Sequence, residues 1–110
     1  MATRKLNPSE WTQYFNQINK SINHSLVTIE ILSPDLGDQI EVRWQLLQGF
    51  SIDHKENSLI VFTENLNHRI SEPKEIYINE AAGNVTTIEI TDKDDVKQLI
   101  RLQDLSRKVA

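Results

Sequence analysis

The sequence predicts a single α+β domain in which an N-terminal helix packs on a bent antiparallel sheet of five or six strands. Three observations lead to this fold class. An apolar stripe with helical spacing occupies the first 22 residues, alternating apolar and polar residues follow it, and short polar turns separate the alternating runs. No linker or internal repeat divides the 110 residues, so residues 1–110 are assigned to one domain.

The helix is predicted over residues 8–22. Asn7 suits the N-cap position, Pro8 suits the first helical position, and Glu10 completes a capping box. Apolar side chains then recur at i, i+3, i+4, i+7 and i+11, which places them on one face of a helix. The residues of that face are Trp11, Tyr14, Phe15, Ile18 and Ile22.

The first two strands are predicted at about 25–32 and 39–52, joined by a turn at 34–38 that makes them a hairpin. In both runs apolar residues alternate with polar ones, as expected when one face of a strand packs on the core. The second run is long, and Gly49 permits a bend or a bulge within it. The alternation places four residues on its core face: Ile40, Val42, Trp44 and Leu46.

The second half of the chain continues with short alternating runs, which predict strands at about 58–63, 74–80, 85–91 and 96–102. Residues 64–73 are expected to form an irregular connection. The final run fits a helix almost as well as a strand, and we assign a strand because the turn residues 92–95 directly follow the preceding strand. Residues 105–110 are expected to be a frayed or helical tail.

A small closed barrel is the alternative to an open sheet. A bend at Gly49 would let the sheet curl into an SH3-like or Sm-like barrel, with the helix across one end. An open sheet of six strands with the helix covering one face fits the same pattern, so the sequence leaves both arrangements open.

The composition disfavours several classes of function. The chain has 16 acidic and 12 basic residues, a net charge of -4, and no basic run that would follow a nucleic-acid backbone. The lack of cysteine excludes a disulfide framework, a thiolate metal site and a cysteine nucleophile. No apolar run is long enough to cross a membrane and no signal peptide is recognisable, so we expect a cytoplasmic protein.

The sequence predicts no catalytic residue, no cofactor and no metal site, and therefore no enzyme. His24, His54 and His68 are interpreted as solvated loop histidines, because none shares a helix face with another ligand. The acidic turn at 92–95 lacks the glycine and the bidentate glutamate of a calcium loop. The three glycines are isolated, and no serine lies in a nucleophile elbow.

Three leucines are candidates for an interaction surface. Leu32, Leu47 and Leu66 lie off the predicted core faces or in a loop, where side chains exposed together would form an association patch.

Both tryptophans, Trp11 and Trp44, are interpreted as core residues that pack the helix on the sheet. The functional alternative is an exposed aromatic platform that stacks on a base or ring beside basic side chains. Arg43 and Arg69 are the nearest candidates for that role and complete the predicted interaction surface.

Four segments in the first half of the chain carry a resemblance: residues 1–4 (MATR), 11–15 (WTQYF), 26–32 (LVTIEIL) and 34–39 (PDLGDQ), the last followed by Glu41 and Val42. With a looser match from Gly49 to Phe62, they resemble an uncharacterised family of short bacterial proteins that is frequent in cyanobacteria. The resemblance implies a bacterial cytosolic protein whose chain ends in a strand. It supplies no catalytic residues.

The favoured function is therefore a small non-enzymatic interaction or scaffold protein that associates with itself, because an open sheet leaves strand edges to be covered. The alternative is a small barrel that binds single-stranded RNA or a small ligand, an analogy drawn from fold alone. The net charge of -4 weighs against nucleic acid.

Overall fold

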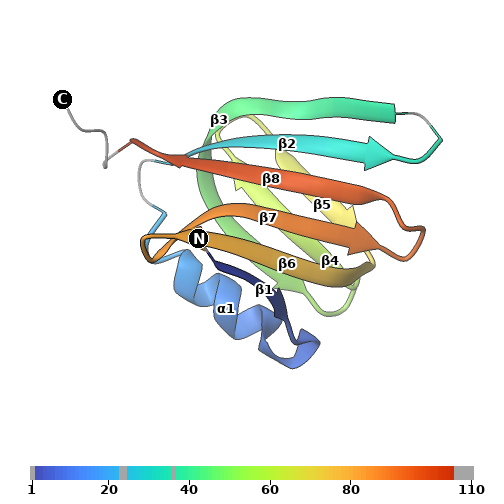
Figure 1. The fold of residues 1–110 in the computed structure, drawn as a ribbon, viewed down its shortest axis with the longest axis horizontal. Coiled ribbons are helices and arrows are strands. Elements are labelled where there is room, and N and C mark those ends of the chain that lie inside the picture. The colour runs from blue at the N-terminus through green and yellow to red at the C-terminus, as the bar shows by residue number, and fades with distance from the viewer. Residues whose placement is uncertain (1, 23–24, 36, 106–110) are drawn as a thin grey trace.

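The computed structural model describes residues 2–22, 25–35 and 37–105, which form an eight-stranded antiparallel sheet with one short α-helix (Figure 1). The chain begins with β1 (Ala2–Leu6), a 3-10 helix η1 (Pro8–Glu10) and α1 (Trp11–Ile18). The other strands are β2 (Ser25–Ser33), β3 (Gly37–Asp53), β4 (Ser58–Thr63), β5 (Asn67–Ser71), β6 (Pro73–Ala81), β7 (Asn84–Asp92) and β8 (Lys97–Asp104). In these ranges no helix has the length and apolar character needed to span a membrane.

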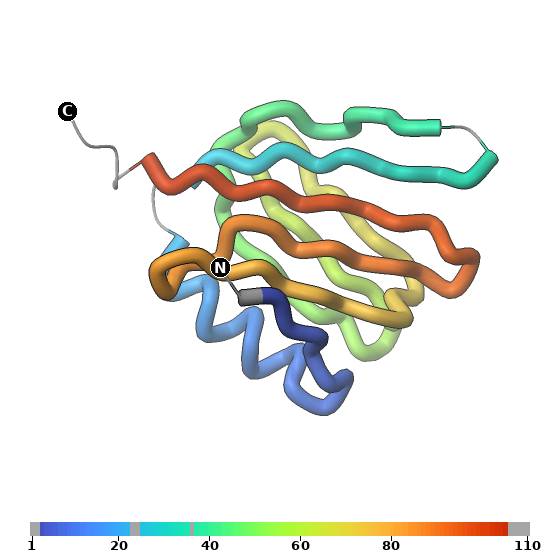
Figure 2. Tube along the Cα trace, in the orientation of Figure 1, coloured from blue at the N-terminus to red at the C-terminus, as the bar shows by residue number. Residues whose placement is uncertain are grey.

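The sheet folds into two layers that share β3. The front layer consists of β1, β6, β7, β8, β2 and the first part of β3, and the back layer consists of the second part of β3, β4 and β5. The strand order is β1-β6-β7-β8-β2-β3-β4-β5, and all neighbours are antiparallel. Residues 37–46 of β3 pair with β2, whereas residues 47–53 pair with β4. Between these two parts β3 curves out of the front layer and continues behind it, beside β4 and β5 (Figure 1, Figure 2).

The centre of the front layer is a row of branched apolar residues. The register aligns one residue from each of five neighbouring strands, and each side chain is at most 2% exposed: Ile78, Ile88, Ile100, Ile29 and Val42. Such side chains pack well on a pleated surface that is covered by a second layer. The back layer adds to the same core Phe50, Leu59, Val61 and Ile70.

α1 is fixed to the back layer by one aromatic contact and one side-chain amide. The rings of Phe15 and Phe50 lie 5.3 Å apart between centroids. Asn19 Nδ2 donates to the Phe50 carbonyl at 2.8 Å, and the Phe50 N–H donates to Asn19 Oδ1 at 2.8 Å. The amide thus takes the place of a neighbouring strand at this point of β3. A Cβ at Gly49 would lie 3.4 Å from Asn19 Oδ1, so the missing side chain gives the amide room.

The predicted fold class is wrong: the protein is mostly sheet, with eight strands rather than five or six. The prediction omits β1, and it assigns β5 to the irregular stretch 64–73. Both are short edge strands with a single well-buried apolar residue each, Leu6 and Ile70, so neither shows a readable alternation. The barrel alternative is wrong as well, because in the described chain β1 pairs only with β6 and β5 only with β4.

The predicted helix is too long, although its start is confirmed. The Ser9 N–H donates to Asn7 Oδ1 and the Asn7 N–H donates to Glu10 Oε1, each at 3.1 Å, which completes the capping box. The first turn is a 3-10 helix, and α1 ends at Ile18 rather than at residue 22. Asn19, the residue after the last helical one, directs its amide to β3.

The six predicted strands are present, with ends that differ by at most two residues from the predicted ones. β2 and β3 form the predicted hairpin, and the ambiguous final run is a strand, β8. A shift of register between Leu47 and Gly49 confirms the predicted irregularity in the long strand. Most of the predicted tail, residues 106–110, lies outside the described residues.

Candidate functional site

The register between β3 and β2 shifts twice along their length. From the pair Glu30–Ile40 to the pair Val27–Gln45, β2 advances by three residues and β3 by five. The two extra residues of β3 form bulges, which bend the strand and change the face to which side chains point. The alternation seen in the sequence therefore does not hold in this stretch.

Trp44 lies at one of these bulges in a strained conformation. Its φ is 47°, and it is the one described non-glycine residue with positive φ that lies within a strand. Such a backbone costs a bulky residue about 1–3 kcal/mol. The Trp44 N–H donates to the hydroxyl of the buried Thr28 at 3.1 Å, a hydrogen bond that holds the bulge in place.

The predicted core position is wrong for Trp44, whose side chain is 45% exposed. The bulges are the physical reason, because they break the two-residue period on which the prediction depends. Trp11, by contrast, packs in the core as predicted, at 9% exposed.

Exposed apolar side chains gather on this part of the molecule. Five large hydrophobic residues are exposed in the described chain. Three of them lie in one seven-residue stretch of β3 and a fourth lies in the β4–β5 turn beside it: Ile40, Trp44, Leu46 and Leu66. The Glu64 N–H donates to the Leu46 carbonyl at 2.9 Å, which ties the turn to β3. We call these four residues the β3 edge patch.

The backbone along this patch is also an open edge. Residues 37–46 pair with β2 on one side, and no strand of the described chain pairs with them on the other. An edge of this kind presents free N–H and C=O groups to another molecule. The bulges interrupt it, so a partner would meet side chains as well as backbone.

Two charged residues that lie between Ile40 and Trp44 on β3, Glu41 and Arg43, have no ion-pair partner in the described chain. Elsewhere on the front layer, two charge pairs are matched across neighbouring strands. Lys97 lies 3.3 Å from Glu89, and Arg101 lies 3.3 Å from Glu30.

The structure brings together only part of the predicted interaction surface. Leu66 and Arg43 are exposed at or near the patch, and Leu32 is half-buried on β2. Leu47 is 7% exposed and belongs to the core. Arg69 lies on β5 and pairs with Asp53 at 3.4 Å. Trp44, Ile40 and Leu46 are the residues that sequence reasoning missed, because nothing local marks the bulges that expose them.

Of the histidines predicted to be solvated loop residues, His54 agrees with the prediction and His68 does not. His54 is exposed, and its Nε2 lies 2.8 Å from the Thr12 hydroxyl of α1. His68 is half-buried in β5 rather than in a loop, and its Nε2 lies 2.7 Å from Gln98 Oε1 of β8, joining the two layers. His24 lies outside the described residues. Within the described ranges, no three His, Asp or Glu side chains gather as a metal site would require.

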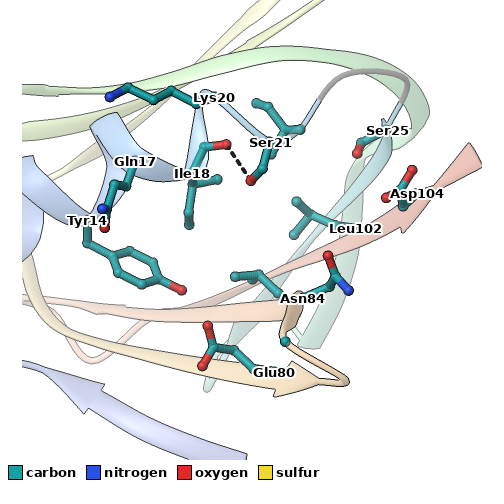
Figure 3. A pocket seen from close by; sticks show the side chains of 13 residues that line it. Tyr14, Gln17, Ile18, Lys20, Ser21, Ser25, Glu80, Asn84, Leu102 and Asp104 are labelled. Atoms are coloured by element: carbon teal, nitrogen blue, oxygen red, sulfur yellow. Dashed lines mark hydrogen bonds between the residues drawn. The ribbon is translucent and has the colours of Figure 1, made fainter. Parts of the chain in front are cut away.

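A second surface feature is a cleft of about 420 Å³ between the end of α1, the β6–β7 turn and the end of β8 (Figure 3). Tyr14 lies on its wall, and its hydroxyl is shielded from solvent without a hydrogen-bond partner among the residues that the structure describes. Burial and the nearby charge of Glu80 raise the pKa of Tyr14 well above its ordinary value. The hydroxyl therefore stays protonated at neutral pH.

Comparison with known proteins gives a family and no function. The chain is 36% identical over 104 residues to an uncharacterized protein of Aquifex aeolicus (strain VF5). The matched residues make up 94% of each of the two chains. No solved structure matches. The model of a family of unknown function, DUF5335, matches residues 2–108. The chain therefore belongs to DUF5335, a family of unknown function.

Proposed function

We propose that this protein is a small non-enzymatic interaction protein of the bacterial cytoplasm that associates with itself through the β3 edge patch. Trp44 is the observation that carries the proposal. A half-exposed tryptophan held in a strained backbone is unfavourable for the monomer, and strain of this kind concentrates where a protein binds. Tryptophan is also enriched among the residues that dominate binding energy. The narrower cyanobacterial origin is part of the same proposal.

A second copy of the chain is the partner that the patch fits best. In a twofold interface the same surface is used by both subunits, so residue i meets residue j and j meets i. If two β3 strands lie antiparallel about an axis beside Val42, Glu41 of each chain lies at the level of Arg43 of the other. In the same arrangement Ile40 faces Trp44, an aromatic pair with a β-branched residue that is favourable between strands. Two unmatched charges and two exposed apolar residues would then be satisfied together.

The alternative of an RNA-binding barrel has lost its basis. It depended on a closed Sm-like strand order, and the sheet is open with eight strands.

Charge reversal at the axis tests the proposal. Sedimentation equilibrium of the wild-type protein is expected to give a dimer, and Glu41→Arg or Arg43→Glu alone is expected to give a monomer, because like charges would then face each other. The double variant Glu41→Arg/Arg43→Glu restores opposite charges and is expected to restore the dimer. Lys55→Glu, in the exposed β3–β4 turn, is the matched control and should leave the dimer intact.

Two results would contradict the proposal. A wild-type protein that stays monomeric at the highest concentrations would exclude self-association. A double variant that stays monomeric would show that Glu41 and Arg43 do not face each other across a twofold axis.

A further inference from the structure

We propose that the cleft beside α1 binds a small primary amine that carries a short apolar chain. The cleft is distinct from the β3 edge patch and does not depend on self-association. Its volume of about 420 Å³ is within the range of small-molecule sites. It is built from α1, the start of β2, the β6–β7 turn and the end of β8, which meet at one corner of the fold (Figure 3).

The charged groups of the cleft favour a cation. Glu80 lines it, and Lys20, the basic residue among its described lining residues, directs its side chain away from the interior (Figure 3). Glu80 belongs to none of the ion pairs of the described chain, whereas Glu30, Glu75 and Glu89 of the sheet each pair with a basic side chain. An ammonium group placed at Glu80 would give this carboxylate a charge-assisted hydrogen bond to a cation.

Tyr14 supplies a second polar group next to Glu80. Its hydroxyl points towards the Glu80 side of the cleft (Figure 3), and no group of the described chain lies in ordinary hydrogen-bond geometry to it. A buried polar atom without a partner is rare in folded proteins, and at the wall of a cleft a bound molecule can supply the partner. The phenol oxygen accepts hydrogen bonds as well as donating them, so an ammonium between the two residues would satisfy both.

The rest of the cleft suits an apolar chain. Four aliphatic side chains from α1, the segment after it, β7 and β8 line it: Ile18, Ile22, Val85 and Leu102. A cleft with an apolar lining and a few converging polar groups selects an alkylammonium over a bare metal cation, because only the former buries carbon there.

Titration of the ¹⁵N-labelled protein with n-hexylammonium chloride, followed by amide chemical shifts, tests the inference. Saturable shifts are expected at Ser21, Gly83 and Asn84, and 1-hexanol, which has the same chain without the charge, should bind at least about tenfold more weakly. Glu80→Gln should weaken hexylammonium binding by about the same factor. Glu75→Gln is the matched control, since it removes a carboxylate from the same strand outside the cleft, and it should bind like the wild type.

The inference would be overturned by three results. These are an absence of saturable shifts at the cleft, equal binding of hexanol and hexylammonium, or undiminished binding by a folded Glu80→Gln variant. None of these bears on the dimer, which is tested by sedimentation.

Discussion

A tryptophan at positive φ costs folding free energy that a glycine at the same place would not cost. Trp44→Gly is therefore expected to have a free energy of unfolding about 1 kcal/mol higher than Trp44→Ala. Both variants lose the ring, so the difference between them isolates the backbone at 44. Urea denaturation, at concentrations where the protein is monomeric, measures it. A glycine variant that is no more stable than the alanine variant would show that the bulge is relaxed.

Tyr14 gives the protein a specific sensitivity to alkaline pH. Its pKa is raised above the ordinary value of 10.0 by burial and by the charge of Glu80, so the folded state keeps a proton that the unfolded state releases. The stability linked to this group is complete below pH 10 and is lost as the pH rises above it. Denaturation between about pH 9 and pH 11 should show a steeper loss for the wild type than for Tyr14→Phe.

Tyr77→Phe is the control for that comparison, because it removes a tyrosine of β6 and leaves Tyr14 in place. It should retain the steep loss of stability. If Tyr14→Phe and the wild type follow the same pH profile, the Tyr14 hydroxyl is not buried in the folded protein.

Among the elements, α1 is joined to the backbone of β3 by the side-chain amide of Asn19, beside the aromatic contact of Phe15 with Phe50. Asn19→Ala leaves the N–H and the C=O of Phe50 without these partners, and the free energy of unfolding should fall by about 2 kcal/mol. Asn16→Ala, on the exposed face of the same helix, should change it by less than about 0.5 kcal/mol. Thermal or urea denaturation of both variants checks the difference, and equal losses would mean that α1 is held by its apolar face alone.

The strands that the sequence predicts are those in which several apolar residues alternate, as in β2 or β7. β1 and β5 are not predicted, because each has one buried apolar residue, which packs against residues of other strands. A run with one buried residue shows no period. The bulges of β3 are missed for a related reason, since a register shift is a property of two strands together. The cleft is also invisible in the sequence, because Tyr14, Glu80 and Leu102 are distant along the chain.

At the scale of the whole molecule, self-association should appear as a dependence of stability on concentration. If folded chains dimerise and unfolded chains do not, dimerisation favours the folded state by mass action. The thermal midpoint of the wild type should therefore rise with protein concentration. The midpoint of Trp44→Gly should not, because the ring at the centre of the proposed interface is missing. Differential scanning calorimetry over a hundredfold range of concentration, about the range in which a micromolar dimer dissociates, measures both. Parallel behaviour of the two proteins would exclude Trp44 from the interface.

The place of β8 in the sheet has a consequence for how the protein is made. β8 is the last of the described strands along the chain, yet it lies between β7 and β2 and contributes Ile100 to the central row. On the ribosome, β2 and β7 emerge before the strand that separates them, and their facing edges stay open until it follows. The front layer can therefore assemble only after β8 has been synthesised. A nascent chain halted before residue 97 would expose two uncovered strands and be prone to aggregate, whatever its first 96 residues are able to form.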